Sequence, residues 1–211
     1  ISRLAHWMLE NADPNNPIFV ADLADAKQPI KTIWKSMNRN DLESFESDFQ
    51  NLLERSGLLR KIGSERIEFS HRTLGEYLAS QQFVANYSEG FLAQRAHIDL
   101  WHETIVFAIG YANEANPIFR DNLLKRIIEQ AKNLNSKDIY LLLLSCLEHR
   151  DLQLDSELQK HFEMAISEIL PLKNANEAIT ISRANDWAAD YLHYNPKWSP
   201  KQLGFTVDAL G

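Results

Sequence analysis

Residues 56–69 read Ser-Gly-Leu-Leu-Arg-Lys-Ile-Gly-Ser-Glu-Arg-Ile-Glu-Phe and carry the clearest β signal in the sequence. The stretches 58–62 and 66–69 have strand-like composition and flank Gly63-Ser64, a pair that suits a tight hairpin turn. Ser56-Gly57 stands where a helix commonly ends through a left-handed residue. The stretch therefore predicts a helix that leads into a small β-hairpin.

Helical periodicity surrounds the predicted hairpin on both sides. Asp41 is the predicted N-cap of a helix over 42–55, whose apolar residues recur along one stripe. Further upstream, the pattern predicts a short helix around residues 4–8, another over 18–25, and a third in which Pro29 occupies the first turn. After the hairpin, Ser70 is the predicted N-cap of a helix that reaches about Tyr87. The apolar face of this helix is predicted to comprise Leu74, Tyr77, Leu78 and Val84.

The remainder of the chain has helical patterns of similar length with loop signals between them. Helices are predicted over 98–111, 118–132, 137–148, 156–170 and 174–191. Their succession suits stacked helix pairs of the HEAT or armadillo kind, although a compact bundle would produce the same periodicity. The predicted fold is mainly α, with a winged-helix domain over 1–88 and a helical domain over 89–211. Either a bundle or the start of a HEAT-like solenoid fits the second domain.

Composition narrows the classes of protein to consider. The chain has 45% hydrophobic and 24% charged residues, the balance of a globular protein with a core. The formal net charge is −7 and the pI is near 5.5, which disfavours nucleic acid as a partner. The longest apolar run, 140–144, is far shorter than the roughly 20 residues that span a bilayer, so we expect a soluble protein without a membrane partner. The single cysteine, Cys146, lies in an apolar helical pattern and is expected to be a buried hydrophobe, as suits a reducing cytoplasm.

The continuation of the hairpin carries a family resemblance. Residues 69–79 read Phe-Ser-His-Arg-Thr-Leu-Gly-Glu-Tyr-Leu-Ala, which resembles the Phe-x-His and Glu-Tyr-Leu-Ala pattern of NACHT-type signalling NTPases. Ser-Gly-Leu-Leu at 56–59 also resembles the stretch that precedes the hairpin in that family. The resemblance is specific over about thirty residues. It departs from the family at Leu74-Gly75, where Phe-Gln is common.

The resemblance implies a regulatory role for this chain. In the family, the histidine that matches His71 contacts the phosphates of bound ADP and holds the closed state. A histidine at the start of a helix lies beside unpaired N–H groups, a setting that favours anions. The chain has no Gly-x-x-x-x-Gly-Lys-Ser/Thr loop, so we expect no catalytic site and no cofactor in this segment itself. The ATP or ADP and Mg²⁺ would be held by a nucleotide-binding domain upstream of Ile1, in a longer protein that works in defence, including antiviral innate immunity, or in stress signalling.

Several alternatives remain open at this stage. A helical scaffold that binds a protein ligand, or that self-associates, would need no nucleotide at all. A DNA-binding winged helix could use the cations at 35, 39, 55, 60, 61 and 66, but the helix over 42–55 carries many acidic residues. His102-Glu103 begins like a zinc-protease helix, yet position 106 is valine, so the second metal ligand is missing. His97 and His102 are expected to be surface residues, and the aromatic residues at 101, 107, 111 and 119 are expected to pack between helices.

Overall fold

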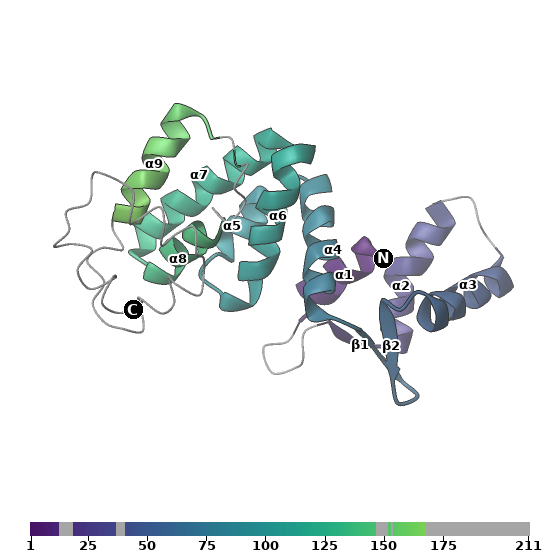
Figure 1. Cartoon of the computed structure of the whole chain (residues 1–211). Coiled ribbons are helices and arrows are strands. Elements are labelled where there is room, and N and C mark those ends of the chain that lie inside the picture. Colours follow the sequence, from purple (N-terminus) through teal and green to yellow (C-terminus); the bar gives the residue numbers. More distant parts are fainter. Residues whose placement is uncertain (13–18, 37–40, 147–151, 153, 168–211) are drawn as a thin grey trace. The chain divides into compact units, whose positions relative to one another are not determined.

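The computed structural model describes residues 1–12, 19–36, 41–146, 152 and 154–167 (Figure 1). The chain divides into two compact units, one from Ile1 to Asn86 and one that begins at Tyr87. In their described parts both units are mainly helical, and the first also contains a three-stranded antiparallel sheet. The prediction of a mainly α chain with a small β element is confirmed. None of the described helices combines the length and the apolar composition needed to cross a membrane.

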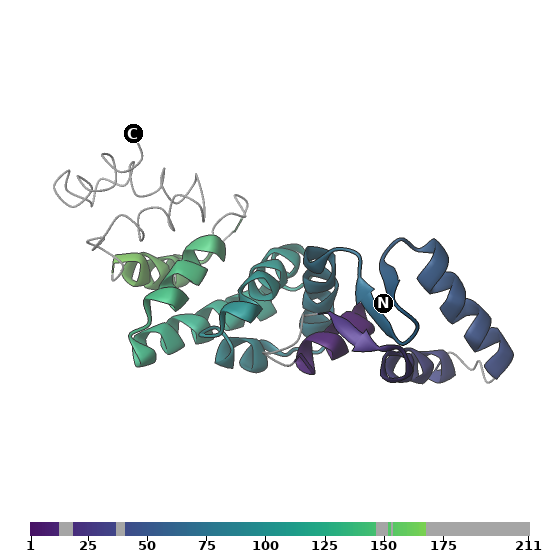
Figure 2. The ribbon, with the colours of Figure 1, turned by 90° about the horizontal axis from the view of Figure 1, so that it is seen from below.

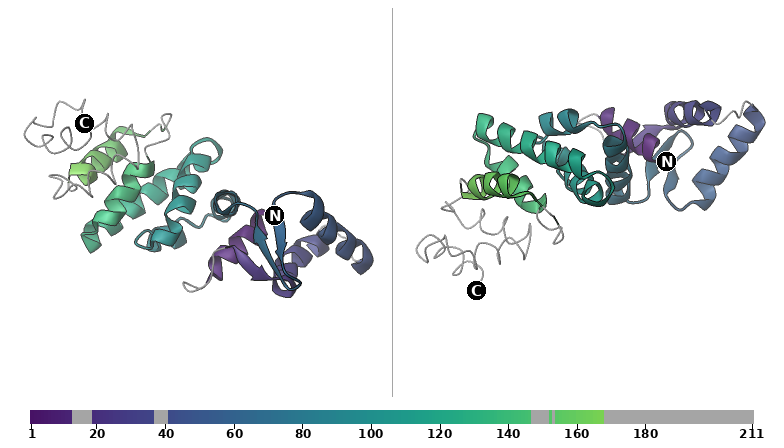
Figure 3. Two further views of the ribbon diagram at one scale, coloured as in Figure 1. Left: turned by 60° about the horizontal axis from the view of Figure 1, so that its bottom comes forward. Right: turned by 90° about the horizontal axis from the view of Figure 1, so that it is seen from above.

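The first unit consists of helices around a small sheet. Its elements are α1 (Ser2–Glu10), β1 (Val20–Asp22), α2 (Leu23–Ser36), α3 (Leu42–Arg55), β2 (Leu59–Ile62), β3 (Arg66–Phe69) and α4 (Arg72–Ala85). The strand order is β1-β3-β2, and the strands lie side by side in Figure 3. Gly57 and Gly63 have φ values of 67° and 63°, the left-handed conformation that glycine adopts without a steric penalty. The predicted hairpin, and the helix that leads into it, are confirmed.

The strand β1 was not expected, because the prediction placed a helix over 18–25. Val20, Ala21 and Asp22 instead pair antiparallel with Glu68, Ile67 and Arg66 of β3. The backbone N–H of Leu23 also donates to the carbonyl of Glu65 at 2.7 Å. Without β1, one edge of β3 would have unpaired backbone groups, and pairing satisfies them. This long-range pairing overrides the local helical pattern.

The predicted start of a helix at Pro29 is also wrong, since α2 already begins at Leu23 and Pro29 lies inside it. A proline keeps a helical φ angle, but it removes the hydrogen bond that its own nitrogen would donate to the carbonyl of Asp25, and its ring crowds that carbonyl. The helix can therefore run through this position at a cost in stability. The N-cap predicted for α3 is confirmed: Asp41 accepts hydrogen bonds from the backbone of Glu43 at 3.1 Å and from the hydroxyl of Ser44 at 2.5 Å.

Helix α4 differs from its prediction in its first residue and in its buried face. The N-cap is His71 rather than Ser70, because the N–H of Ser70 donates to the carbonyl of Leu58 and extends the hairpin pairing by one residue. Most of the predicted apolar face is not the buried face: only Val84 of it is buried, and Tyr77 is 39% exposed. The buried side is built instead from small or polar residues together with one aromatic residue, namely Gly75, Glu76, Ala79, Ser80 and Phe83. Small side chains allow α1 to pack closely on this side of α4.

The second unit is helical throughout its described part. Its elements are α5 (Glu89–Gln94), the 3-10 turn η1 (Asp99–Trp101), α6 (His102–Ala115), α7 (Pro117–Leu134), α8 (Lys137–Cys146) and α9 (Ser156–Ser167). Helix α7 contacts α5, α6, α8 and α9, and Figure 2 shows it among them. The core of the second unit contains buried apolar residues of α6 and α7, including Ile105, Ile109, Leu123 and Ile127.

Three of the helices predicted in the second unit begin within one residue of their predicted starts, namely α7, α8 and α9. Asn116 caps α7 by accepting a hydrogen bond from the N–H of Phe119, and Asn135 ends that helix with a left-handed φ of 46°. The helix predicted over 98–111 is instead the turn η1 followed by α6, and α5 was missed altogether. Cys146 is buried, as expected. Residues 168–170 of the fourth predicted helix, and the whole of 174–191, lie outside the described residues.

Candidate functional site

His71 lies at the junction between the hairpin and α4, and backbone hydrogen bonds fix this junction on both sides. On the hairpin side, the N–H of Phe69 donates to the carbonyl of Phe19 at 3.2 Å, and that of Ser70 donates to Leu58 at 2.8 Å. On the helix side, the carbonyl of His71 accepts hydrogen bonds from the backbone of Leu74 and Gly75 at 3.1 and 3.3 Å. Its imidazole makes no capping hydrogen bond and is exposed. The junction therefore presents a histidine ring to solvent from a fixed backbone.

The first turn of α4 gives this position an electropositive surrounding. The N–H groups at the start of a helix have no acceptor within the helix, and the helix dipole adds partial positive charge there. The next residue, Arg72, is half exposed and places its Nε 2.8 Å from the Glu76 carboxylate, which is only 2% exposed. The pair orients the guanidinium along α4. Together, the exposed imidazole and the helix N-terminus can donate hydrogen bonds to an anionic group.

The departure from the family pattern at Gly75 has a physical cause in this structure. A Cβ atom built on Gly75 would lie 2.8–3.0 Å from three ring atoms of Phe19, closer than carbon atoms normally approach. Phe19 is 2% exposed, has a φ of 60°, and packs edge-to-face on Phe69 with ring centroids 5.6 Å apart. The ring therefore occupies the space that a side chain at position 75 would fill. Because Gly75 has no side chain, the ring of Phe19, which precedes β1, can pack directly against α4.

No family model, curated protein or solved structure matches this chain.

Two of the cations proposed for a DNA-binding surface have side-chain partners in the first unit. Arg60 forms an ion pair with Glu68 across the hairpin, and Lys61 donates to the side chain of Gln50 at 3.0 Å. Lys27, which was not among those cations, lies 2.7 Å from the carboxylate of Glu46 on α3. The other exposed positions on α3 include Glu43 and Glu54, while Arg39 lies outside the described residues. The solvent-facing side of α3 is thus acidic, which opposes contact with phosphates.

In the second unit, a groove lies between α6 and α8, and we call it the α6–α8 groove. Its volume is about 420 Å³, and it is lined by apolar residues of both helices together with acidic residues, two histidines and Ser145. His97 is exposed, as expected, but the His102 side chain is only 21% exposed, and its Nε2 lies 2.9 Å from the carbonyl of Ala96. Among the described residues, no three His, Cys, Asp or Glu side chains are grouped so as to hold a metal ion. Sequence reasoning missed this groove because its two walls are more than thirty residues apart in the chain.

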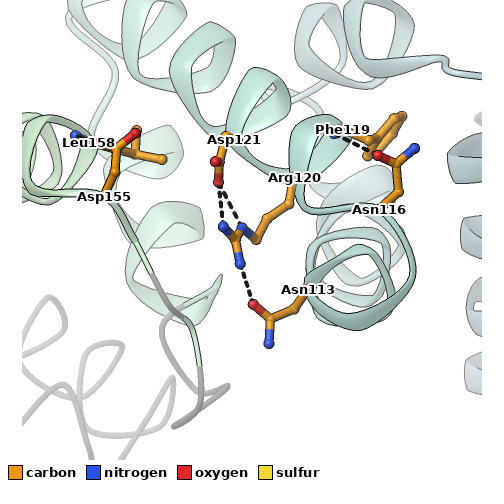
Figure 4. Close-up of polar contacts among 7 residues, drawn as sticks. All are labelled: Asn113, Asn116, Phe119, Arg120, Asp121, Asp155 and Leu158. Carbon is orange, nitrogen blue, oxygen red and sulfur yellow. Dashed lines mark hydrogen bonds and ion pairs between the residues drawn. The ribbon is translucent and has the colours of Figure 1, made fainter.

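A buried arginine in α7 was also missed, and Figure 4 shows its partners. The Arg120 side chain is 6% exposed, and its Nε and Nη2 both lie 2.7 Å from Oδ1 of Asp121. Its Nη1 donates to Oδ1 of Asn113 on α6 at 2.5 Å. Asp155 caps α9 by accepting from the N–H of Leu158, and this hydrogen bond lowers the pKa of its carboxyl. The guanidinium hydrogen-bonds α6 to α7, a structural role that leaves it little access to a ligand.

The aromatic residues of the second unit pack as expected only in part. Trp101 and Phe119 are buried, whereas Tyr111 is 37% exposed. The rings of Phe91 and Trp101 meet edge-to-face at 5.5 Å, and the Arg95 guanidinium lies 3.4 Å from the Phe91 centroid. These contacts hold the start of α6 against α5 rather than forming a cage for a ligand.

Proposed function

We propose that the first unit is the winged-helix lever of a NACHT-type signalling NTPase, and that His71 reports the state of a nucleotide held by another domain of the same protein. The observation that carries the proposal is the exposed imidazole of His71 on the fixed junction between β3 and α4. A displacement of His71 would move the hairpin and α4 together, because hydrogen bonds join this residue and its neighbour to both. The second unit then serves as the helical arm that the lever moves.

The order of elements supports this proposal. The succession α1, β1, α2, α3, β2 and β3, with sheet order β1-β3-β2, is the order of a winged-helix domain. In a DNA-binding protein of this kind, α3 would enter the major groove. Here its solvent-facing side is acidic, which favours a role inside a regulatory protein over one on DNA. In the second unit, helices contact both their next and their next-but-one neighbours from α6 to α9, which supports a HEAT-like arm.

A hydrogen bond from His71 supplies only part of the free energy that the switch requires. Moving a two-state switch from mostly closed to mostly open requires about 5.5 kcal/mol of differential binding. One hydrogen bond from a histidine to a charged phosphate contributes about 1.5–3 kcal/mol. Packing must supply the rest, and the half-buried Leu74 and Leu78 with the partly exposed Tyr77 form an apolar side of α4 that could do so. The partner for this packing is the upstream domain that would hold ADP, or ATP with Mg²⁺.

The experiment replaces His71 in the protein that includes the residues before Ile1. The variant His71→Ala should lose ADP faster and become active without its signal, while His71→Gln, which keeps one N–H donor, should retain part of the affinity. A matched control is His161→Ala in α9, outside the proposed contact. ADP retention is measured from the rate at which labelled nucleotide dissociates, and activation is measured from oligomer formation. The proposed setting of this activation is the cytoplasm, for example in antiphage defence.

The alternatives predict different outcomes for the same variants. If ADP release and activation are unchanged in His71→Ala, the sensor role is wrong and the first unit is a structural part of a scaffold. If the residues before Ile1 contain no phosphate-binding loop, the nucleotide itself is excluded from the proposal. Salt-dependent binding of duplex DNA by the first unit would instead support the alternative that this chain is a DNA-binding regulator.

A further inference from the structure

The α6–α8 groove combines an apolar interior with an acidic rim. Val106 of α6 and Leu141 of α8 are only half buried, although Leu142 beside them is 2% exposed. The groove therefore keeps accessible apolar surface, and its volume of about 420 Å³ is within the range of roughly 300–1,000 Å³ found for ligand sites. The four lining residues of α8 are Asp138, Leu141, Leu142 and Ser145, which recur at helical spacing along one side. An elongated ligand can follow this stripe.

The charges around the groove are of one sign. Asp99, Glu103 and Asp138 line it and are exposed, and none of its lining residues is lysine or arginine. Asp99 comes from the turn before α6, Glu103 from the first turn of α6 and Asp138 from the first turn of α8. The carboxylates therefore come from two segments of the chain, the continuous stretch of η1 and α6 and the start of α8, and all three line one cavity. Carboxylates at the edges of an apolar cleft attract cationic side chains and help to select them.

One wall of the groove is held in place by His102. Because a carbonyl oxygen can only accept, the Nε2 of His102 carries a hydrogen and donates to Ala96 across 2.9 Å. Its Nδ1 then lies 3.4 Å from the Asp99 carboxylate. The Nε2 hydrogen bond joins the start of α6 to the chain before η1 and so holds this wall of the groove in place. A preformed groove spares a ligand the cost of ordering it.

From these observations we infer that the α6–α8 groove binds a basic peptide segment of another protein, with lysine or arginine side chains against the carboxylates and an aliphatic side chain between α6 and α8. Charge complementarity selects this occupant over an acidic or a purely apolar one. The groove lies wholly in the second unit, so the inference and the nucleotide role of His71 can fail independently.

The test uses the whole chain and a fluorescein-labelled peptide of alternating lysine and leucine. Binding is followed by fluorescence polarisation at low ionic strength, where exposed charges are least screened. The double variant Glu103→Gln, Asp138→Asn should raise Kd about tenfold, because two ion pairs with the peptide are lost. The control double variant Glu114→Gln, Glu129→Gln makes the same change in net charge at exposed positions outside the groove and should change Kd less than about twofold.

Two further peptides separate groove binding from general attraction to an acidic protein. Replacing the leucines by serine should weaken binding, because the apolar contacts are lost, and replacing the lysines by glutamate should abolish it. The inference is overturned if the two double variants weaken binding equally, if the serine peptide binds as well as the leucine peptide, or if no basic peptide binds. It is also overturned if sedimentation shows that Glu103→Gln, Asp138→Asn breaks a dimer, since the occupant would then be a second copy of this chain.

Discussion

The contact between Gly75 and Phe19 leads to a prediction that reverses the usual effect of replacing a helical glycine. In an open helix, Gly→Ala stabilises a protein by about 1 kcal/mol. At Gly75, the added methyl group would lie 2.8–3.0 Å from the Phe19 ring, whose γ carbon is among the atoms too close. The ring cannot simply swing away, because it is 2% exposed and packs on Phe69. Overpacking of this kind costs about 1–3 kcal/mol, so Gly75→Ala should destabilise the first unit by up to about 2 kcal/mol.

The assay is urea unfolding of the full chain, with amide hydrogen exchange measured by mass spectrometry to separate the first unit from the second. Gly90→Ala provides the matched control, because Gly90 lies in α5 with no atom within 4 Å of its added Cβ. That variant should be neutral or stabilising by up to about 1 kcal/mol. The two substitutions are chemically identical, so any difference in sign arises from their surroundings.

A double-mutant cycle tests whether the Phe19 ring causes the expected loss of stability in Gly75→Ala. Phe19→Ala removes the ring and should cost about 3–5 kcal/mol by itself. In that background the clash is absent, and Gly75→Ala should become stabilising by about 1 kcal/mol. If Gly75→Ala has the same effect with and without the Phe19 ring, or if it stabilises the unaltered chain as Gly90→Ala does, the proposed packing is wrong.

Two other predictions concern a largely buried histidine, His6, in the first unit and a buried arginine, Arg120, in the second. Burial lowers the pKa of His6, which the Glu10 carboxylate 3.2 Å away opposes, so the unfolded chain binds this proton more readily than the folded one. The stability of the first unit should therefore be complete above the ordinary histidine pKa of 6.5 and decline as the pH falls below it; His6→Gln should remove this dependence in urea unfolding between pH 7.5 and 5. In the second unit, Asp121→Ala should cost about 3 kcal/mol because it leaves a buried guanidinium unpaired, whereas Arg120→Met removes that charge and should cost less. Equal losses of unfolding free energy in these two variants would contradict the assignment of Arg120 as a buried, paired charge.

The prediction of the hairpin succeeded because its determinants are local. Gly57 and Gly63 adopt positive φ angles that disfavour other residues, and Asp41 caps the helix that leads into the hairpin. Asn116 and Asn135 mark the two ends of α7 in the same way. Each of these features depends on the chemistry of one residue and its immediate neighbours, which a sequence displays directly.

The errors of prediction share the opposite cause. Residues 20–22 were expected in a helix because their neighbours favour one, and only the free edge of β3 makes them a strand. The apolar side of α4 was placed on its larger residues, whereas α1 and Phe19 pack where the side chains are small. For the candidate sites, the position of His71 after the hairpin was predictable, but its exposure and its role as N-cap were not.

The amino-acid sequence by itself determined the helix caps, the hairpin turn, the breaks between helices and the acidic character of the chain, since these follow from local conformational preferences and composition. Tertiary structure alone decided which side of α4 is buried, why residue 75 is glycine, and that Asp99, Glu103 and Asp138 meet around one groove. The physical reason is that packing and electrostatic convergence depend on atoms that are distant in sequence, and their proximity is set only when the helices have packed.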